Sequence, residues 1–158
     1  MKYAAAITLL LLSAGSAGAS PHQTGIESPA ARIMHRLDLS LAGTGCLPLE
    51  PAVYAPMVTV SHNWSGPKVL TRSAFIAAFS RDMPLLTSTF GKPIVTRSFT
   101  AGSTVVITVK YPPGNATANP PLQIAFFFLV KDSRILEEEV FADRLQLKPV
   151  LDALRRHT

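Results

Sequence analysis

The sequence has very few residues of the kinds that cross-link a chain, cross a membrane or bind nucleic acid. Cys46 is the only cysteine among 158 residues, so neither an internal disulfide nor a metal site built from several thiolates can form. No apolar run reaches the roughly 20 residues that span a bilayer. The basic residues are scattered rather than interleaved with aromatic ones, although the formal net charge is +5. We therefore expect no metal site, no membrane span after processing and no nucleic-acid partner.

The first 19 residues have the pattern of a secretory signal peptide. Lys2 supplies a positive charge, Ala4–Leu12 is apolar, and Ala17-Gly18-Ala19 provides the small residues of a cleavage site. Residues 20–27 are polar and predict a flexible leader, followed by a single domain over residues 28–158. We expect the protein to be secreted, or periplasmic if the host is bacterial, with Cys46 buried as a small hydrophobic residue.

Helical periodicity is clear in two segments and at the end of the chain. Ser28-Pro29 is a helix start signal, and the apolar residues that follow recur on one face as far as Gly43. Residues 71–83 predict a second helix that stops before Pro84. A closing helix is expected after Asp143. These helices need a sheet on which to bury their apolar sides.

The strands are predicted from alternation of apolar and polar residues. Residues 57–64 alternate so that His62 and Trp64 share the inner face with two valines. Residues 94–99 and 104–111 form a hairpin, a turn-rich loop covers 112–121, and two long strands meet at the tight turn 131–134. The order predicts an α+β domain whose antiparallel sheet is covered by helices on one side.

Three successive glutamates lie in the middle of the last predicted strand. Neighbouring strand residues point to opposite faces, so Glu137 and Glu139 share one face and Glu138 takes the other. One interpretation is a solvated run of charges. The other places Glu137 or Glu139 in a cavity as a general acid or base.

Further candidates for a site lie on the other predicted strands. His62 has a side chain that titrates near neutral pH, so it suits proton transfer, although a core histidine that bonds to the backbone is equally compatible. Trp64 and Tyr111 are candidates for lining the same cavity. Asn63 and Asn115 each begin a glycosylation sequon, which matters only in a eukaryotic host, and Asn115 in the loop is the better acceptor.

Two passages resemble the SnoaL-like polyketide cyclase branch of the nuclear transport factor 2-like superfamily. The first is Ser65-Gly66 followed by residues 71–79 and Arg81-Asp82-Met83-Pro84, which is similar to a glycine loop, second helix and terminating proline. The second comprises residues 131–137 and 143–147, which are similar to the last hairpin turn, last strand and following helix. Ser133 replaces the usual turn glycine, and Glu139 replaces a frequent aromatic residue.

The resemblance implies a cone-shaped α+β barrel, in which a curved antiparallel sheet and helices at both ends of the chain enclose an apolar cavity. It also implies an acid/base role for Asp143, although an aspartate directly before a helix is a natural N-cap. His62 stands where ketosteroid isomerases carry their aspartate base, and their second acid is missing, so that mechanism is not expected.

Three functions remain open on these grounds. One is a cofactor-independent cyclase, isomerase or dehydratase that acts on a small hydrophobic polyketide-like or terpenoid-like molecule. Another is a non-catalytic module that binds such a molecule in the same cavity. The last is an interaction protein that pairs through its sheet, in the simplest case as a homodimer.

Overall fold

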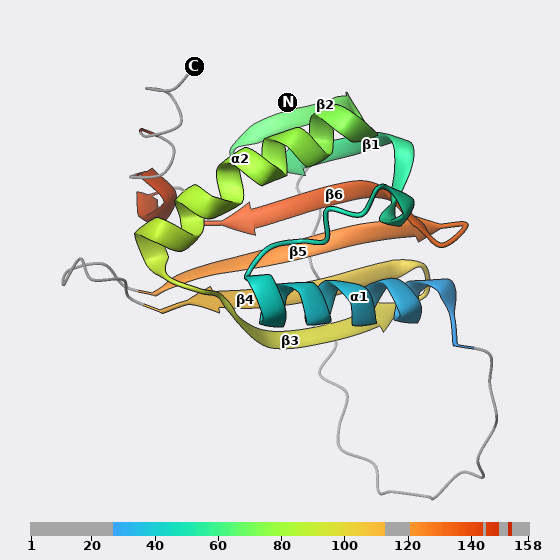
Figure 1. Cartoon of the computed structure of the whole chain (residues 1–158), viewed down its shortest axis with the longest axis horizontal. Helices are drawn as coiled ribbons and strands as arrows, with labels where there is room; N and C mark the ends of the chain where they lie inside the picture. Colours follow the sequence, from blue (N-terminus) through green and yellow to red (C-terminus); the bar gives the residue numbers. More distant parts are fainter. Residues whose placement is uncertain (1–26, 113–120, 144, 149–151, 153–158) are drawn as a thin grey trace, which may run out of the picture.

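The structure, a computed structural model, describes residues 27–112, 121–143, 145–148 and 152. The predicted signal peptide, most of the predicted leader, Asn115 and most of the closing helix lie outside this part. The described elements, in chain order, are α1 (Pro29–Thr44), a short 3-10 helix η1 (Pro51–Val53), β1 (Tyr54–His62), β2 (Ser65–Thr71), α2 (Arg72–Phe90), β3 (Ile94–Ala101), β4 (Thr104–Tyr111), β5 (Leu122–Lys131) and β6 (Arg134–Ala142). Figure 1 shows their arrangement.

Helix α1 begins and ends as the sequence predicts. The hydroxyl of Ser28 accepts a hydrogen bond from the backbone N–H of Ala31, and Pro29 occupies the first turn, where a missing N–H costs nothing. At the other end Gly45 has a φ of 76°, a left-handed conformation that glycine adopts without strain. The buried side of the helix consists of residues at helical spacing: Ala30, Ile33, Leu37 and Leu41.

The six strands form one mixed, curved sheet in the order β2-β1-β6-β5-β4-β3. Four neighbouring pairs are antiparallel, as expected, but β1 and β6 run parallel. A purely antiparallel sheet was therefore the wrong expectation for this one pair. The reason is topological, because β1 and β6 are joined by almost the whole domain rather than by a turn. The sheet is also open, with β2 and β3 as its edges, so the expected barrel does not close.

Strand β2 was missed by the sequence analysis, which treated its first residues as a loop. Every residue of β2 except Leu70 is exposed, so the strand lacks the buried alternation by which strands are recognised. Pro67 is tolerated because β2 is an edge strand, paired only with β1. The sheet therefore has one more strand than the sequence predicted.

Helix α2 continues to Phe90, beyond the stop predicted at Pro84. Pro84 lies inside the helix with its ring exposed, while Met83 and Phe90 on either side are buried. A proline in a helix interior costs a hydrogen bond and about 3 kcal/mol. Burial of the residues that follow Pro84 offsets that cost. A local stop signal in the sequence cannot reveal such burial.

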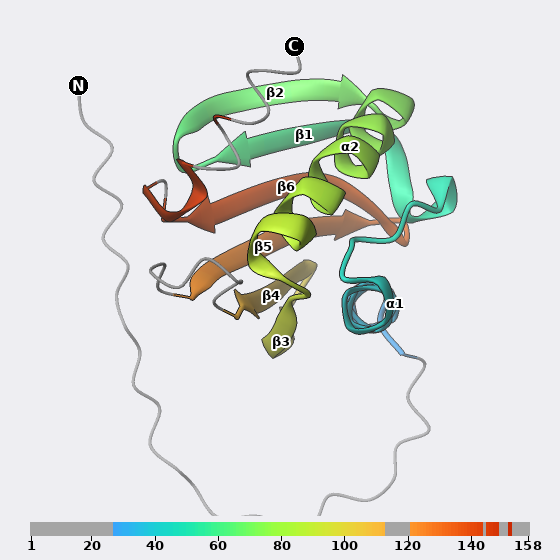
Figure 2. The ribbon, with the colours of Figure 1, turned by 60° about the vertical axis from the view of Figure 1, so that its left-hand side comes forward.

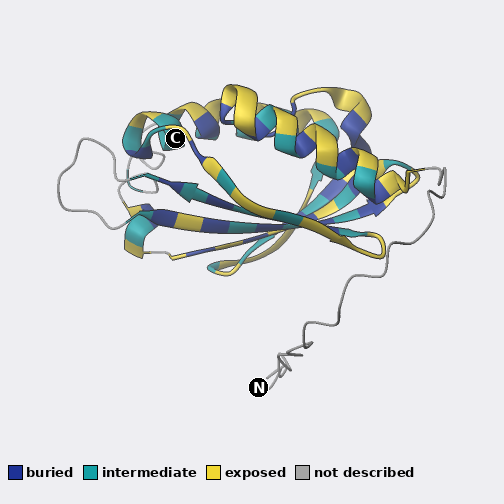
Figure 3. Cartoon of the chain, turned by 90° about the horizontal axis from the view of Figure 1, so that it is seen from below, coloured by how far each residue is buried: buried dark blue, intermediate teal, exposed yellow. Residues whose placement is uncertain are grey.

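Both helices cover the same face of the sheet, which we call the inner face (Figures 2 and 3). The core lies between them and the inner-facing residues of the strands, including Val58, Ile107 and Phe128. The opposite, outer face has no helix over it among the described elements (Figure 3). No described helix is long and apolar enough to cross a membrane. Cys46 is half-buried rather than buried, and it is free.

Candidate functional site

A cavity of about 280 Å³ lies between α2 and the inner face of the sheet. Its walls are almost entirely apolar, and His62 and Asp82 are the two ionisable residues among those that line it. An apolar chamber with a few polar groups is the usual form of a small-molecule site. The lining residues are Val60, His62, Trp64, Leu70, Phe75, Ala78, Phe79, Asp82, Met83, Leu86, Ile124, Phe126, Val140 and Leu147.

His62 is the last residue of β1, and its half-buried side chain lines this cavity as predicted. Its Nδ1 lies 3.2 Å from the hydroxyl of Ser65 on β2, across the short turn that joins the two strands. Its ring also packs against the indole of Trp64, with centroids 4.8 Å apart. If Nδ1 donates its hydrogen to Ser65, Nε2 is left as the proton acceptor.

The environment of His62 keeps the imidazole neutral. Burial lowers the pKa of His62 below its usual value of 6.5, and the positive charge of Lys68 on β2 lowers it further. The carboxylate of Asp82 acts in the opposite direction and raises the pKa of His62. At neutral pH the side chain is therefore mostly unprotonated and able to accept a proton, with a carboxylate nearby to stabilise the resulting cation.

Asp82 was not recognised as a site residue from the sequence. It lies on α2 at helical spacing from Phe75, Phe79 and Leu86, all of which line the cavity. A carboxylate in an otherwise apolar helical stripe was the available signal. Its two oxygens lie 2.6 and 3.3 Å from the exposed guanidinium of Arg81.

The three glutamates divide between the faces as parity predicts, but the candidate pair lies on the wrong side. Glu137 and Glu139 are exposed on the outer face, whereas Glu138 is only 1% exposed and points into the core. The pairing of β5 with β6 shifts between Leu129 and Val130, which leaves Leu136 as an extra residue in β6. This bulge lets Ile135 and Glu138 both face inward, so the exposure of Glu137 and Glu139 fits the interpretation as a solvated run of charges and not the one that places either in the covered cavity.

Asp143 caps a helical turn, which was the alternative to the acid/base role that the resemblance implied. Its Oδ1 accepts a hydrogen bond from the backbone N–H of Leu145 at 2.8 Å, and its carbonyl accepts one from Leu147 at 3.0 Å. These contacts cap the helical turn of residues 145–148. The side chain is exposed and is not among the residues that line the cavity, so the geometry does not support the acid/base role implied by the resemblance.

The two predicted aromatic lining residues have different locations. Trp64 lines the cavity beside His62, as expected. Tyr111 does not; it is fully buried on β4, with its ring 6.3 Å from that of Phe90. The expectation for Tyr111 was wrong because its inner-facing position lies beyond the cavity, toward the end of the sheet where α2 terminates. Burial raises the pKa of Tyr111, whose hydroxyl has no hydrogen-bond partner among the described residues.

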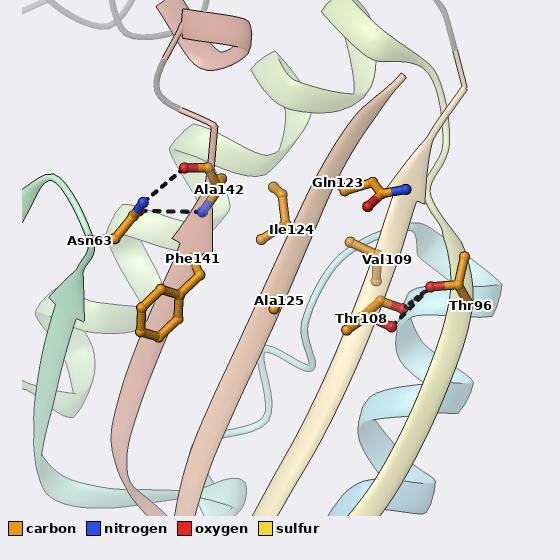
Figure 4. Close-up of a pocket in the computed structure, with 9 residues that line it drawn as sticks. All are labelled: Asn63, Thr96, Thr108, Val109, Gln123, Ile124, Ala125, Phe141 and Ala142. Atoms are coloured by element: carbon orange, nitrogen blue, oxygen red, sulfur yellow. Dashed lines mark hydrogen bonds between the residues drawn. The ribbon is translucent and has the colours of Figure 1, made fainter. Parts of the chain in front are cut away.

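Asn63 faces outward and lies in a separate hollow on the outer face, which Figure 4 shows with the helices behind the sheet. Its side-chain amide donates to the carbonyl of Ala142 at 3.0 Å and accepts from the N–H of the same residue at 3.2 Å. Thr96 and Thr108 also bond to each other there, at 2.9 Å. Because these groups satisfy one another, the hollow offers a ligand little, and attachment of a glycan at Asn63 would disturb the end of β6.

The described residues contain no group of three or more histidine, cysteine, aspartate or glutamate side chains that could hold a metal ion. His62 and Asp82 give the cavity groups that can exchange protons with an apolar guest.

The curved mixed sheet with helices over one face and an apolar cavity beneath α2 is the nuclear transport factor 2-like fold. An NTF2-like protein of unknown function from Mesorhizobium loti superposes with a TM-score of 0.58 at 19% identity, over 77% of this chain and 97% of that one. A protein from Jannaschia sp. assigned as a SnoaL-like polyketide cyclase gives 0.55 at 15%, over 85% and 99%. TerC, co-crystallised with polyporic acid, gives 0.56 at 14%, over 79% and 99%.

These neighbours confirm the fold that the sequence resemblance implied, and they include the SnoaL-like branch itself. No family model matches the sequence, and no curated protein has a matching sequence.

Proposed function

We propose that this protein binds a small hydrophobic molecule in the cavity beneath α2 and catalyses proton transfer on it, with His62 as the general base. The carrying observation is the position of His62: a half-buried imidazole, with its pKa lowered by burial, in the wall of an otherwise apolar cavity. A base that is neutral near pH 7 can accept a proton from an acidic C–H group without first losing one of its own.

Asp82 and Ser65 complete the proposed machinery. Ser65 holds the ring through Nδ1, and when Nδ1 donates to the serine hydroxyl, Nε2 is the nitrogen that accepts a proton from the substrate. Asp82 stabilises the imidazolium that forms when His62 takes the proton, a role supported by the direction in which its charge moves the pKa of His62. The same imidazolium can return the proton to another atom of the substrate, which gives an isomerisation, a cyclisation or a dehydration without a cofactor.

The cavity restricts the size and polarity of the substrate. A volume of about 280 Å³ lies at the lower limit of the roughly 300–1,000 Å³ typical of ligand pockets. A compact, mostly hydrocarbon molecule with an acidic C–H next to a carbonyl fits both the walls and the chemistry. Polyketide-like and terpenoid-like compounds have these properties, and the cyclase and TerC neighbours support that class.

A non-catalytic binding module is the second candidate. It is favoured by the location of Glu137, Glu139 and Asp143 outside the cavity, which leaves His62 and Asp82 as the ionisable lining residues. In that case the same chamber holds its ligand without turnover.

Export and pairing are further parts of the proposal. The pattern of residues 1–19 supports secretion, or delivery to the periplasm, and Asn115 is the better of the two glycan acceptors in a eukaryotic host. The outer face supports a homodimer, since it exposes 39% of Phe141 and 43% of Phe99 around the less exposed Phe127. A second copy would cover this uncapped apolar surface.

Deuterium exchange of 2-tetralone tests catalysis directly, because this compact ketone has acidic C–H protons beside its carbonyl. In D₂O at neutral pH, NMR should show protein-dependent loss of those protons, and His62→Gln should reduce the rate by about 100-fold or more. Glu137→Gln, on the outer face, is the matched control and should retain the full rate.

Binding is measured in the same samples from the fluorescence of Trp64, the only tryptophan. Exchange no faster than in buffer, with binding intact, would establish the non-catalytic alternative. The absence of both signals would refute the cavity as a site for this class of molecule.

A further inference from the structure

Glu138 is a buried carboxyl group with no partner among the described residues. Its side chain is 1% exposed, and neither carboxyl oxygen makes a hydrogen bond. Buried polar groups are nearly always paired, and one left unpaired destabilises the fold because it has lost its hydrogen bonds to water. An apolar residue at this position of β6 would avoid that cost. A carboxyl group in this place therefore calls for a partner that the described residues do not supply.

Burial also determines the protonation state of Glu138. Desolvation raises its pKa from 4.5 to about 8, so at neutral pH the side chain is mainly a carboxylic acid. In that form it carries one O–H donor and one carbonyl acceptor. A neutral acid of this kind can donate a hydrogen bond to an oxygen atom in apolar surroundings.

Glu138 is not itself among the residues that line the cavity, but it lies next to two that do. Val60, which lines the cavity, is its partner across the β1–β6 pairing, and Val140, which also lines it, follows two residues later on β6. Residues two apart along a strand are separated by roughly 6.6 Å, a distance within the reach of a glutamate side chain with three rotatable bonds. On β5, Phe128 faces Glu138 and stacks on the lining residue Phe126, with ring centroids 5.9 Å apart.

Tyr54 lies on β1, where it pairs with Ile135, three residues before Glu138 on β6. Burial and then the charge of Glu138 raise the pKa of Tyr54, so the two groups are close enough to interact. The phenol is already used, because it donates to the carbonyl of Pro48 at 2.8 Å. Its ring packs 4.9 Å from that of Phe75, another lining residue. Tyr54 is thus close to Glu138 but does not form a hydrogen bond with its carboxyl group.

We infer that Glu138 is a ligand-binding residue, whose carboxylic acid donates a hydrogen bond to a carbonyl oxygen of the molecule held in the cavity. The inference rests on the proposed function, because it requires that the cavity admit an oxygen-bearing apolar guest. It adds a specificity element on β6, opposite α2. Ligands that place a carbonyl group on the β6 side of the cavity are preferred over hydrocarbons of the same shape.

A matched pair of probes tests this preference. 2-Tetralone and 2-methylenetetralin differ only in C=O against C=CH₂, and their dissociation constants can be measured by Trp64 fluorescence, with calorimetry as a check. For each protein we take the ratio of the affinity for the ketone to the affinity for the hydrocarbon. This ratio should be roughly fivefold higher in the wild-type protein than in Glu138→Met, the value expected for one neutral hydrogen bond. Glu138→Gln keeps an N–H donor and should retain part of the preference.

A second measurement reports the hydrogen bond itself. With ¹³C at the ketone carbon, the bound resonance of the wild-type protein should lie downfield of that in Glu138→Met, because hydrogen bonding polarises the carbonyl. A His62→Phe variant should keep this downfield shift, which separates the effect of Glu138 from that of the His62 imidazole.

The outcomes distinguish the inference from the function on which it rests. If neither probe binds the wild-type protein, the proposed function fails and the inference with it. If both probes bind, but Glu138→Met leaves the ketone-to-hydrocarbon ratio and the carbonyl resonance unchanged, the cavity is a ligand site and the role of Glu138 is refuted.

Discussion

Replacing Glu138 with glutamine isolates the effect of one buried carboxyl group on the pH dependence of stability. Folding raises the pKa of Glu138 from 4.5 to about 8 through desolvation. Between these pH values the folded chain holds a proton that the unfolded chain has released. The free energy of unfolding should therefore decrease as pH rises, because the unfolded state binds fewer protons. The favourable contribution is complete below pH 4.5 and lost once the pH passes about 8.

The magnitude follows from the same two values. Each unit of pKa difference corresponds to about 1.4 kcal/mol, so the full change is on the order of 5 kcal/mol, spread over the interval from pH 4.5 to about 8. Glu138→Gln has no proton to lose at this position and should be free of this component. The difference in stability between the variant and the wild type should therefore grow with pH, in favour of the variant.

Urea denaturation at half-unit steps from pH 5 to pH 9, followed by circular dichroism and by Trp64 fluorescence, measures this difference. Glu139→Gln is the matched control, because it removes a carboxylate one residue away that is exposed on the outer face. Its stability should run parallel to that of the wild type. Parallel curves for Glu138→Gln as well would refute the conclusion that burial holds a proton on Glu138.

Three further changes test other parts of the fold and site. Asp82→Asn removes the charge that raises the pKa of His62, so the imidazole should titrate at lower pH by NMR, and an unchanged midpoint would contradict the electrostatic link. Phe75→Ala should cost about 3–5 kcal/mol in urea unfolding, because this buried ring packs against Tyr54 and Phe79. Pro84→Ala should stabilise the chain by about 2 kcal/mol, since it restores an N–H within α2 at an exposed position; a lower melting temperature would show that the proline is required there.

The sequence predicted those parts of the fold whose signals are local. The capping serine and proline marked the start of α1, the hairpin pattern of residues 94–111 marked β4, and the apolar run of residues 126–130 marked β5. It failed where tertiary contacts decide. Strand β2 is exposed almost throughout, so only its pairing with β1 identifies it. Helix α2 passes Pro84 because Phe90 is buried, a fact about the packed domain rather than about the helix.

The candidate site shows the same division. His62 was placed correctly because Val58, Val60 and His62 alternate onto the inner face of β1, and Trp64, in the turn that follows, also lines the cavity. The sequence correctly separated Glu138 from Glu137 and Glu139 but left open which face lines the cavity, and the extra residue Leu136, which reverses the parity between Ile135 and Glu138, hid the answer. A bulge of this kind leaves no mark in composition or periodicity. Glu138 has the same parity along β6 as Val140 and Ala142, which are both buried, and this was the better indicator that Glu138 faces inward.

The register between β1 and β6 places two ionisable residues in successive rows of the inner face. His62 lies opposite Val140, and Glu138 lies opposite Val60. Burial moves their pKa values in opposite directions, lowering that of His62 and raising that of Glu138. Near pH 7 the inner face therefore carries a neutral base and a neutral acid. Enolisation of a ketone requires both, one to accept the C–H proton and the other to donate to the oxygen, and desolvation by the same apolar core prepares each of them.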